Sequence, residues 1–222
     1  DFIRRMGSKK KPEYLSLGME ALDRLLYLEL GDFVLLGGYA SSGKTLLSLQ
    51  FALALTEKYR VGYFTLETNI KKLTDRLMAH MAQVPLSAIK KCDLDGDDAR
   101  RAADASRRLD RLPLHFIHAS GMTVRDIQAI ALNRRYQVIF VDYLQIISAQ
   151  GKSRYEQVTG ISIALHTMAQ AHGIAVFALV QLSRPEKVGG KLLPPSMASF
   201  RESGQLEQDA DVAFLVYPSN PE

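Results

Sequence analysis

Short apolar runs alternate along the chain with segments whose apolar residues recur at helical spacing. The runs that predict strands are 33–36, 61–66, 114–117, 138–141, 174–179 and 212–216. The segments that predict helices are 17–28, 46–55, 70–82, 97–112, 123–134 and 155–172. The runs 138–141 and 174–179 contain no polar residue, as is typical of strands buried on both faces. This alternation predicts βαβ units, and hence an α/β fold with a mainly parallel, twisted sheet and helices on both faces.

Local signals mark where these elements end. Thr123 and Asp126 have the spacing of a capping box at the start of one predicted helix, and Pro85 should stop another. The segment 183–200 is rich in Gly and Pro, which predicts a loop. Residues 1–12 are polar and basic, so we predict a linker or tail there and a single domain over 13–222.

The segment between the first predicted strand and the next helix carries the most informative motif. It matches G-x-x-x-x-G-K-[ST], the pattern of phosphate-binding loops, and reads Gly38-Tyr39-Ala40-Ser41-Ser42-Gly43-Lys44-Thr45. The glycines let the backbone curl so that its N–H groups point at phosphate oxygens, and the helix that follows adds its positive dipole end. Lys44 can reach the β- and γ-phosphates, and the Thr45 hydroxyl can hold Mg²⁺. The motif therefore predicts ATP and Mg²⁺ as ligands.

An acidic residue is expected to complete the metal site. Asp142 directly follows the run 138–141, where a carboxylate can order the water shell of the metal. Many related ATPases carry a glutamate as the next residue, but Tyr143 stands here, so the catalytic carboxylate must lie elsewhere.

Two further polar residues follow predicted strands at the same edge of the sheet, where ligands of such folds bind. Glu67 is the best candidate for the catalytic carboxylate, and a helix-capping role near Asn69 is the alternative. Gln181 could sense the γ-phosphate and report its loss to nearby loops, whereas an ordinary surface glutamine is the alternative. With Lys44, these two residues form our predicted catalytic set.

Basic residues gather in two loops that follow these strands. They are Lys152, Arg154, Arg184, Lys187 and Lys191. Such loops can contact a phosphate backbone, although a solvated basic surface explains the composition equally well. Few aromatic residues are interspersed, so stacking on nucleic-acid bases is not indicated.

Composition narrows the setting only modestly. A chain of 222 residues suffices for one α/β domain, and its net charge of +4 permits a polyanionic partner without requiring one. Cys92 is the single cysteine, which excludes an internal disulfide and suits a reducing cytoplasm. Because no apolar stretch approaches 18 residues, we expect no membrane span.

Taken together, the motifs resemble the C-terminal ATPase domain of DnaB-type replicative DNA helicases, within the RecA-like superfamily of P-loop NTPases. The matching stretches cover nearly the whole chain: 16–23, 38–45, 64–68, 141–145, 155–158, 180–184 and 200–211. The most specific is Arg201-Glu202-Ser203-Gly204, followed closely by Glu207-Gln208-Asp209-Ala210-Asp211.

This resemblance implies more than the residues show by themselves. It implies a hexameric ring that binds nucleotide between subunits and moves along single-stranded DNA, with primase or loader proteins as further partners. It also implies that Arg201, Glu202 and Gly204 lie near the central channel. The arginine finger of the family is expected beyond residue 222. We therefore expect a domain truncated at its C-terminal end, mainly monomeric and weak in ATP hydrolysis.

Three functions remain open at this point. The leading one is the ATP-binding and ATP-hydrolysing motor domain of a DnaB-like replicative helicase. The second is a RecA-like recombination or repair ATPase that forms a filament on DNA. The third is a nucleotide-switched regulatory module that controls a partner without moving along DNA.

Overall fold

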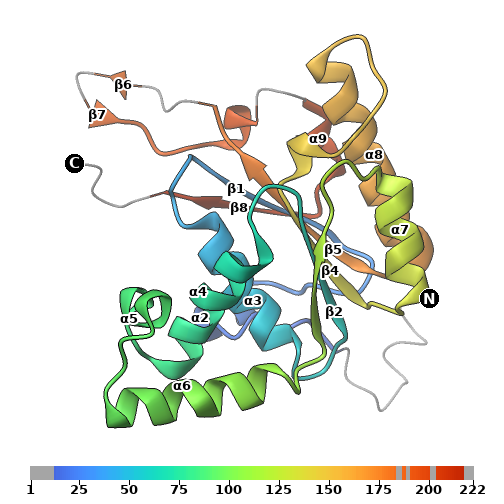
Figure 1. Cartoon of the computed structure of the whole chain (residues 1–222). Coiled ribbons are helices and arrows are strands. Elements are labelled where there is room, and N and C mark those ends of the chain that lie inside the picture. Colours follow the sequence, from blue (N-terminus) through green and yellow to red (C-terminus); the bar gives the residue numbers. More distant parts are fainter. Residues whose placement is uncertain (1–12, 184–186, 189–190, 201–203, 218–222) are drawn as a thin grey trace.

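The computed structural model describes residues 13–183, 187–188, 191–200 and 204–217 of the chain (Figure 1). The predicted linker or tail at 1–12 lies outside the described residues. Among the described helices, none is long and apolar enough to cross a membrane.

The core of the molecule is a six-stranded sheet in which all pairings are parallel. Its strands follow the order β3-β2-β4-β5-β1-β8. Their bounds are β1 (Phe33–Gly38), β2 (Val61–Thr65), β3 (Leu114–His118), β4 (Val138–Asp142), β5 (Ala175–Gln181) and β8 (Val212–Val216). The predicted parallel α/β sheet is confirmed.

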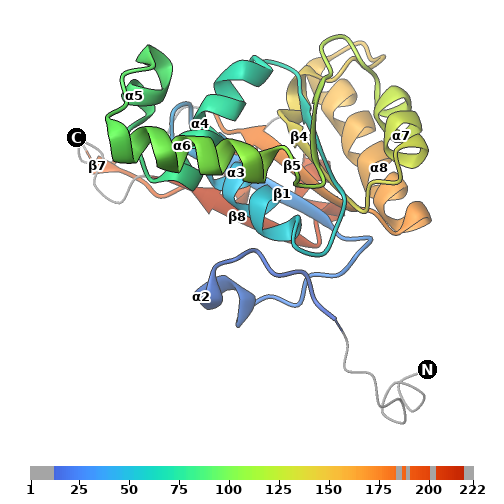
Figure 2. The ribbon, with the colours of Figure 1, turned by 60° about the horizontal axis from the view of Figure 1, so that its bottom comes forward.

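Helices cover both faces of this sheet. The helices of the described residues are α2 (Glu20–Asp23), α3 (Lys44–Leu55), α4 (Ile70–Ala82), α5 (Leu86–Lys91), α6 (Gly96–Leu109), α7 (Val124–Asn133), α8 (Arg154–His172) and α9 (Gly204–Asp209). Figure 2 shows α3, α4 and α6 grouped on one side of the strands, with α7 and α8 grouped on the other. The connections β1–β2 and β2–β3 move along the sheet toward β3 and cross on the face of the first group. The connections β3–β4 and β4–β5 move toward β8 and cross on the face of the second group. This arrangement is expected when every crossover has the same hand.

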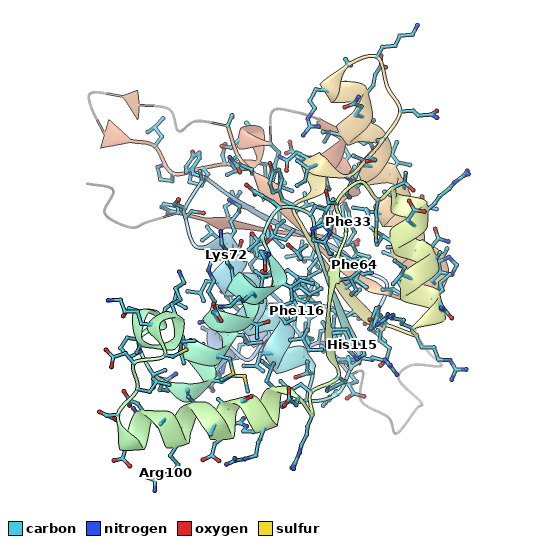
Figure 3. The ribbon with its side chains drawn as sticks, viewed as in Figure 1. Phe33, Phe64, Lys72, Arg100, His115 and Phe116 are labelled. Atoms are coloured by element: carbon cyan, nitrogen blue, oxygen red, sulfur yellow. The ribbon has the colours of Figure 1, made fainter. Side chains whose placement is uncertain are left out.

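Alternate residues of each strand supply two separate cores. Phe33 and Phe64, labelled in Figure 3, belong to the core that packs under α7 and α8. Their neighbours Val34 and Tyr63 belong to the core under α3 and α4. Both cores are built on strands that are buried throughout their length, such as β4 and β5 up to Val180. Such a two-sided core fixes the register of the strands, because a one-residue slip would exchange the two faces.

The strand order creates a switch point at β1 and β5. These strands are neighbours, yet the chain leaves β1 toward one face and leaves β5 toward the other. At such a point the two connecting segments diverge and leave a crevice at the carboxyl ends of the strands. The segments that follow β1 and β5 hold the phosphate-binding motif and Gln181.

The predicted helix over 17–28 is wrong except for the four residues of α2. Outside α2 the segment forms turns and irregular backbone: the Leu15 N–H donates a hydrogen bond to the Leu28 carbonyl oxygen, and Leu17 is buried with both. The Asp23 carboxylate closes a turn by accepting hydrogen bonds from the Leu17 N–H and the Ser16 hydroxyl, each over 2.7 Å. Leu17 and Leu28 are therefore buried by loop packing, whereas Leu25, which lies at the same helical spacing, is exposed.

Two other expectations need correction. The segment 183–200 was predicted as a loop, but it contains the antiparallel strands β6 (Lys187–Val188) and β7 (Lys191–Leu192) and the short 3-10 helix η2 (Met197–Ser199). The helix α5 was not predicted, because six residues are too few to show a helical period. The capping box of Thr123 and Asp126 at the start of α7 is confirmed.

Candidate nucleotide-binding site

A cleft of about 970 Å³ opens at the carboxyl edge of the sheet. Residues 40–45 of the phosphate-binding motif line it, together with Glu67, Asp142 and Gln181. These side chains come from four different strand ends, and the sheet order brings them into a single cleft. The sequence-predicted nucleotide-site residues are therefore gathered in one place, which is the arrangement expected of a ligand site in an open α/β sheet.

The turn between β1 and α3 depends on its two glycines. A Cβ atom at Gly38 would lie 2.4 Å from the Ser42 Oγ and 2.8 Å from the carbonyl oxygen of Val216, so no larger residue fits without a shift. Gly43 precedes α3 with a φ of 95°, in the region that glycine adopts most readily. Together they allow a tight curl of the backbone that runs directly into the N-terminus of α3, where free N–H groups can bind an anion.

Lys44 lies half-buried within this curl. Its ammonium donates hydrogen bonds to the carbonyl oxygens of Gly38, over 2.8 Å, and Tyr39, over 2.9 Å. Burial lowers the pKa of Lys44 below its ordinary value, while the carboxylates of Asp142 and Glu67 oppose this shift. These hydrogen bonds go to neutral backbone acceptors. The ammonium can therefore exchange them for an anion, which would compensate its charge far better.

The Ser42 hydroxyl independently indicates that the curl can accept an anion. Its Oγ is buried and, in the part of the chain that the structure describes, has no hydrogen-bond partner. A buried hydroxyl without a partner is costly and calls for an explanation. An anion that enters the curl would supply the acceptor, so the residues present fit a bound phosphate.

A chain of hydrogen bonds links α3 to the end of β4. The Thr45 hydroxyl donates to Oδ2 of Asp142 over 3.0 Å, and the buried Tyr63 hydroxyl donates to the same oxygen over 3.2 Å. Tyr63 also shares a hydrogen bond of 2.8 Å with Ser48. Thr45 and Asp142 are thus adjacent, as a shared metal ion requires, and Tyr63 holds the carboxylate in place from below.

Burial dominates the electrostatics of Asp142, which is 5% exposed. Burial raises the pKa of its carboxyl group above the ordinary value. The hydrogen bonds from Thr45 and Tyr63 and the charge of Lys44 act in the opposite direction but do not cancel this effect. A divalent cation would therefore favour the ionised carboxylate that burial disfavours.

Glu67 differs from Asp142 in being exposed to solvent at the mouth of the cleft. The alternative role in helix capping is not supported, because Asn69 caps α4 with its own side chain, which accepts a hydrogen bond from the Lys71 N–H. Leu66 is tied to β4 by a hydrogen bond of 2.8 Å from its N–H to the Asp142 carbonyl oxygen. Glu67 thus follows a well-anchored strand end and lines the same cleft as Asp142.

Gln181 ends β5 and lines the cleft with an exposed side chain. Its backbone is held by Gln145, a buried residue of the matching stretch 141–145 to which the sequence patterns assigned no role. The signal that could have revealed Gln145 is its position three residues after Asp142, in a turn that must fold back onto the sheet.

The sequence patterns also gave no warning of a row of basic side chains on α4. Lys72, Arg76 and His80 recur at every fourth residue and line the cleft beyond the phosphate-binding motif. Figure 3 shows Lys72 near the start of α4, whereas Arg100 points from α6 into solvent. Arg76 is half-buried, and no ion pair to it occurs among the described residues. The signal that could have revealed this row is the recurrence of basic residues at positions 72, 76 and 80 within the predicted helix 70–82.

The predicted DNA contacts are placed only in part. Lys152 and Arg154 are exposed where α8 begins, and Gly204 is exposed at the start of α9. Lys187 and Lys191 lie in the β6–β7 pair, and their side chains lie outside what is described. Arg184, Arg201 and Glu202 lie outside the described residues.

Two acids of the 207–211 stretch have structural partners. The buried Asp209 accepts hydrogen bonds of 2.6 Å from Ser162 on α8 and of 2.6 Å from Gln205. Asp211 accepts a hydrogen bond of 2.8 Å from the Phe33 N–H at the start of β1. The stretch therefore anchors α9 and β8 to the rest of the domain.

Comparison with known proteins places this geometry in a family context. The model of the family described as "DnaB-like helicase C terminal domain" matches residues 15–221. The replicative DNA helicase DnaB of Treponema pallidum (strain Nichols) is 31% identical over 212 residues, which cover 91% of this chain and 48% of that protein. A probable plasmid replicative DNA helicase of Chlamydia trachomatis serovar L2 is 31% identical over 202 residues, or 87% of this chain and 44% of that protein.

Solved structures agree with this grouping. One solved structure, described as an ATPase domain, superposes with a TM-score of 0.89 at 27% identity, covering 98% of this chain and 80% of that one. A second, described as a DnaB-like replicative helicase and its interactions with primase, superposes with a TM-score of 0.88 at 26% identity, covering 98% of this chain and 55% of that one. The chain spans about half the length of the curated relatives that it matches.

Proposed function

The chain belongs to the family of DnaB-like helicase C-terminal domains, and we propose that it is the ATP-hydrolysing motor domain of a replicative DNA helicase that acts on single-stranded DNA. The observation that carries this proposal is the single cleft in which the phosphate-binding motif, Asp142, Glu67 and Gln181 meet. Each of these groups has the chemistry that one part of a triphosphatase needs.

The phosphate loop and Asp142 would bind the nucleotide and its metal. The N–H groups of residues 40–45 would cradle the phosphates, and Lys44 would exchange its two carbonyl partners for β- and γ-phosphate oxygens. The Thr45 hydroxyl and the Asp142 carboxylate would hold Mg²⁺, the second directly or through water. When bound, Mg²⁺ would neutralise charge that develops on the phosphate oxygens.

Glu67 would orient the attacking water and accept its proton. An exposed carboxylate in front of Asp142 is free to approach a water molecule on the γ-phosphate side of the cleft. Arg76, one turn beyond Lys72, would add positive charge to the same side. These positions support separate roles for the two carboxylates: Asp142 would help to hold the metal, and Glu67 would orient and deprotonate the attacking water.

Gln181 would detect whether the γ-phosphate is present. Its amide can donate to a phosphate oxygen, and its chain continues directly into the segment that leads to β6 and β7. A change of contact at Gln181 would thus be passed to the loops of this edge, where Lys187 and Lys191 lie. We propose that these loops contact the DNA backbone. The further residues proposed for this contact are Lys152, Arg154, Arg184, Arg201, Glu202 and Gly204.

The proposed assembly is a hexameric ring that encircles single-stranded DNA in the cytoplasm. The relatives named as replicative helicases support it, and one solved relative is described together with its interactions with primase. We accordingly propose primase or loader proteins as partners. A RecA-like filament and a nucleotide-switched module are the alternatives, and the family match does not favour them.

A strand-displacement assay on the longest natural form of this protein tests the proposal. We expect ATP-dependent unwinding of a forked duplex and closed rings in electron micrographs with an ATP analogue. Helical filaments would favour the recombinase alternative. Nucleotide binding without unwinding or single-strand stimulation would favour the regulatory module.

A further inference from the structure

Gln145 makes a two-point contact with the last residue of β5. Its side-chain Nε2 donates to the carbonyl oxygen of Gln181 over 2.8 Å, and the Gln181 N–H donates to the Gln145 Oε1 over 3.1 Å. Gln145 is 3% exposed and follows Asp142 through the short 3-10 helix η1 (Leu144–Ile146). The contact joins the segment after one strand to the end of the neighbouring strand.

The sheet itself explains why a carboxamide is needed there. The pairing of β4 with β5 ends at Val141 and Ala178, whereas β5 continues to Gln181. Beyond Ala178 the edge of β5 that faces β4 would leave backbone groups without partners. A glutamine offers one donor and one acceptor side by side, so it can replace the missing strand residue. An apolar residue of similar size would leave both backbone groups of Gln181 unsatisfied.

The other edge of Gln181 is held by the phosphate-binding loop. Gly38 is its register partner on β1, and the Leu182 N–H donates to the Gly38 carbonyl oxygen over 3.0 Å. The same carbonyl oxygen accepts the hydrogen bond from Lys44. The end of β5 is therefore clamped between the loop that would bind phosphates and the segment that follows Asp142.

We propose that Gln145 is a positioning residue that fixes the backbone of Gln181 and thereby aims its side chain at the γ-phosphate end of the cleft. The inference rests on the proposed function, in which Gln181 detects the γ-phosphate. Gln145 does not line the cleft, so it acts only through Gln181. The same contact couples the end of β5 to the segment 142–147, which begins at Asp142. A displacement of that segment would therefore move Gln181.

Nucleotide discrimination by this chain tests the inference without relying on turnover. The dissociation constants of ADP and of the slowly hydrolysed analogue AMP-PNP are measured by calorimetry for the wild type, Gln145→Leu, Gln181→Ala and the double variant. We expect Gln145→Leu to reduce the preference for AMP-PNP about tenfold, as for the loss of one hydrogen bond to a charged phosphate, and Gln181→Ala to do the same. In the double variant the loss should be no larger than in either single variant, because both act at one contact.

Matched variants separate positioning from loss of folding. Ile147→Val trims a buried side chain of the same segment without touching Gln181, and it should leave the preference unchanged. If thermal unfolding shows that Gln145→Leu does not fold, Gln145→Asn replaces it, since it keeps a neutral carboxamide but is one methylene too short to reach both backbone groups of Gln181. In the wild type, hydrogen exchange of the Gln181 amide should slow more with AMP-PNP than with ADP.

Several outcomes would overturn the inference. They are an unchanged preference in a folded Gln145 variant, additive losses in the double variant, equal wild-type affinity for both nucleotides, or equal protection of the Gln181 amide by both. Failure of the wild type to bind either nucleotide would instead overturn the proposed function.

Discussion

The hydroxyl of Thr45 donates a hydrogen bond of 3.0 Å to Oδ2 of Asp142, although the two residues are 97 positions apart in the chain. Thr45 lies in the first turn of α3, and Asp142 is the last residue of β4. The contact brings the two proposed metal ligands together. The Asp142 carboxyl group lies where burial raises its pKa, so the fold disfavours its ionised form.

Replacing Asp142 by asparagine should stabilise the free protein and impair metal use. Because burial raises the pKa of Asp142 above 3.8, the folded state binds the proton more tightly than the unfolded chain. Protonated Asp142 therefore contributes its whole share of the folding free energy below pH 3.8, and this contribution is lost as the pH rises through the raised pKa of the folded state. Asp142→Asn stays neutral, so at pH 7 the midpoint of thermal unfolding should rise by about 2–4 °C, as for about 1 kcal/mol.

The control for this effect is Asp126, whose pKa is lowered by hydrogen bonds from the backbone and side chain of Thr123. Asp126→Asn should not raise the midpoint. The same Asp142→Asn protein should lose the Mg²⁺ dependence of nucleotide binding. In the wild type that dependence should weaken toward acidic pH, because a ligating carboxylate must be ionised. A lower midpoint of thermal unfolding for Asp142→Asn would contradict the claim that burial disfavours the ionised Asp142 carboxylate.

Lys44→Ala should abolish ATP binding in calorimetry, with a loss of at least about 100-fold. Among the described residues, the ammonium donates its hydrogen bonds to the carbonyl oxygens of Gly38 and Tyr39, so its removal costs the fold little and the phosphates much. Lys58→Ala, which breaks an exposed ion pair with Glu13, is the matched control and should bind ATP normally. Retained micromolar affinity in Lys44→Ala would remove the basis for the phosphate-loop assignment.

Glu67→Gln should separate binding from hydrolysis in the longest natural form of the protein. The amide keeps the shape of the side chain but cannot accept a proton, so turnover should fall at least about 100-fold while the affinity for ATP changes little. Glu57→Gln alters another exposed glutamate, outside the cleft, and should behave as wild type. Steady-state hydrolysis and equilibrium binding give the two quantities. Normal turnover in Glu67→Gln would mean that another group serves the water.

Gly38→Ala should destabilise the protein by about 1–3 kcal/mol in chemical denaturation, as overpacking does. The new Cβ would lie 2.4 Å from the Ser42 Oγ and 2.8 Å from a backbone oxygen of β8, so both the loop and the edge strand must shift. Gly160→Ala in α8 is the opposite case, because nothing lies within 4 Å of its Cβ. That variant should gain about 0.5–1 kcal/mol from helix propensity. Equal stability of the two variants would show that the loop is not tightly packed.

Most of the fold could be predicted because its signals are strong and local. The all-apolar runs identified the central strands, and the bounds of α4 agree with those expected from its helical spacing. The segment 17–28 is misleading, because Leu17 and Leu28 are buried by loop packing and happen to be spaced, with the exposed Leu25, like residues of a helix. The β6–β7 pair was missed because two-residue strands leave no alternating pattern.

The site residues that belong to a sequence motif or directly follow a strand could be predicted. Those that only the packing of distant elements brings to the site could not. Lys44, Thr45 and Asp142 follow from spacing and from strand ends. The roles of Tyr63, Gln145 and Arg76 depend on which strands and helices become neighbours, and that order is not written in any local segment. Strand order is set by the whole set of crossovers, so partners that act from behind the site emerge only with the structure.

ATP hydrolysis by the longest natural form of this protein, measured with and without single-stranded DNA, tests the central claim most directly. The account predicts turnover that single-stranded DNA stimulates and that both Lys44→Ala and Glu67→Gln abolish. Turnover that is indifferent to DNA, or that survives both substitutions, would contradict it.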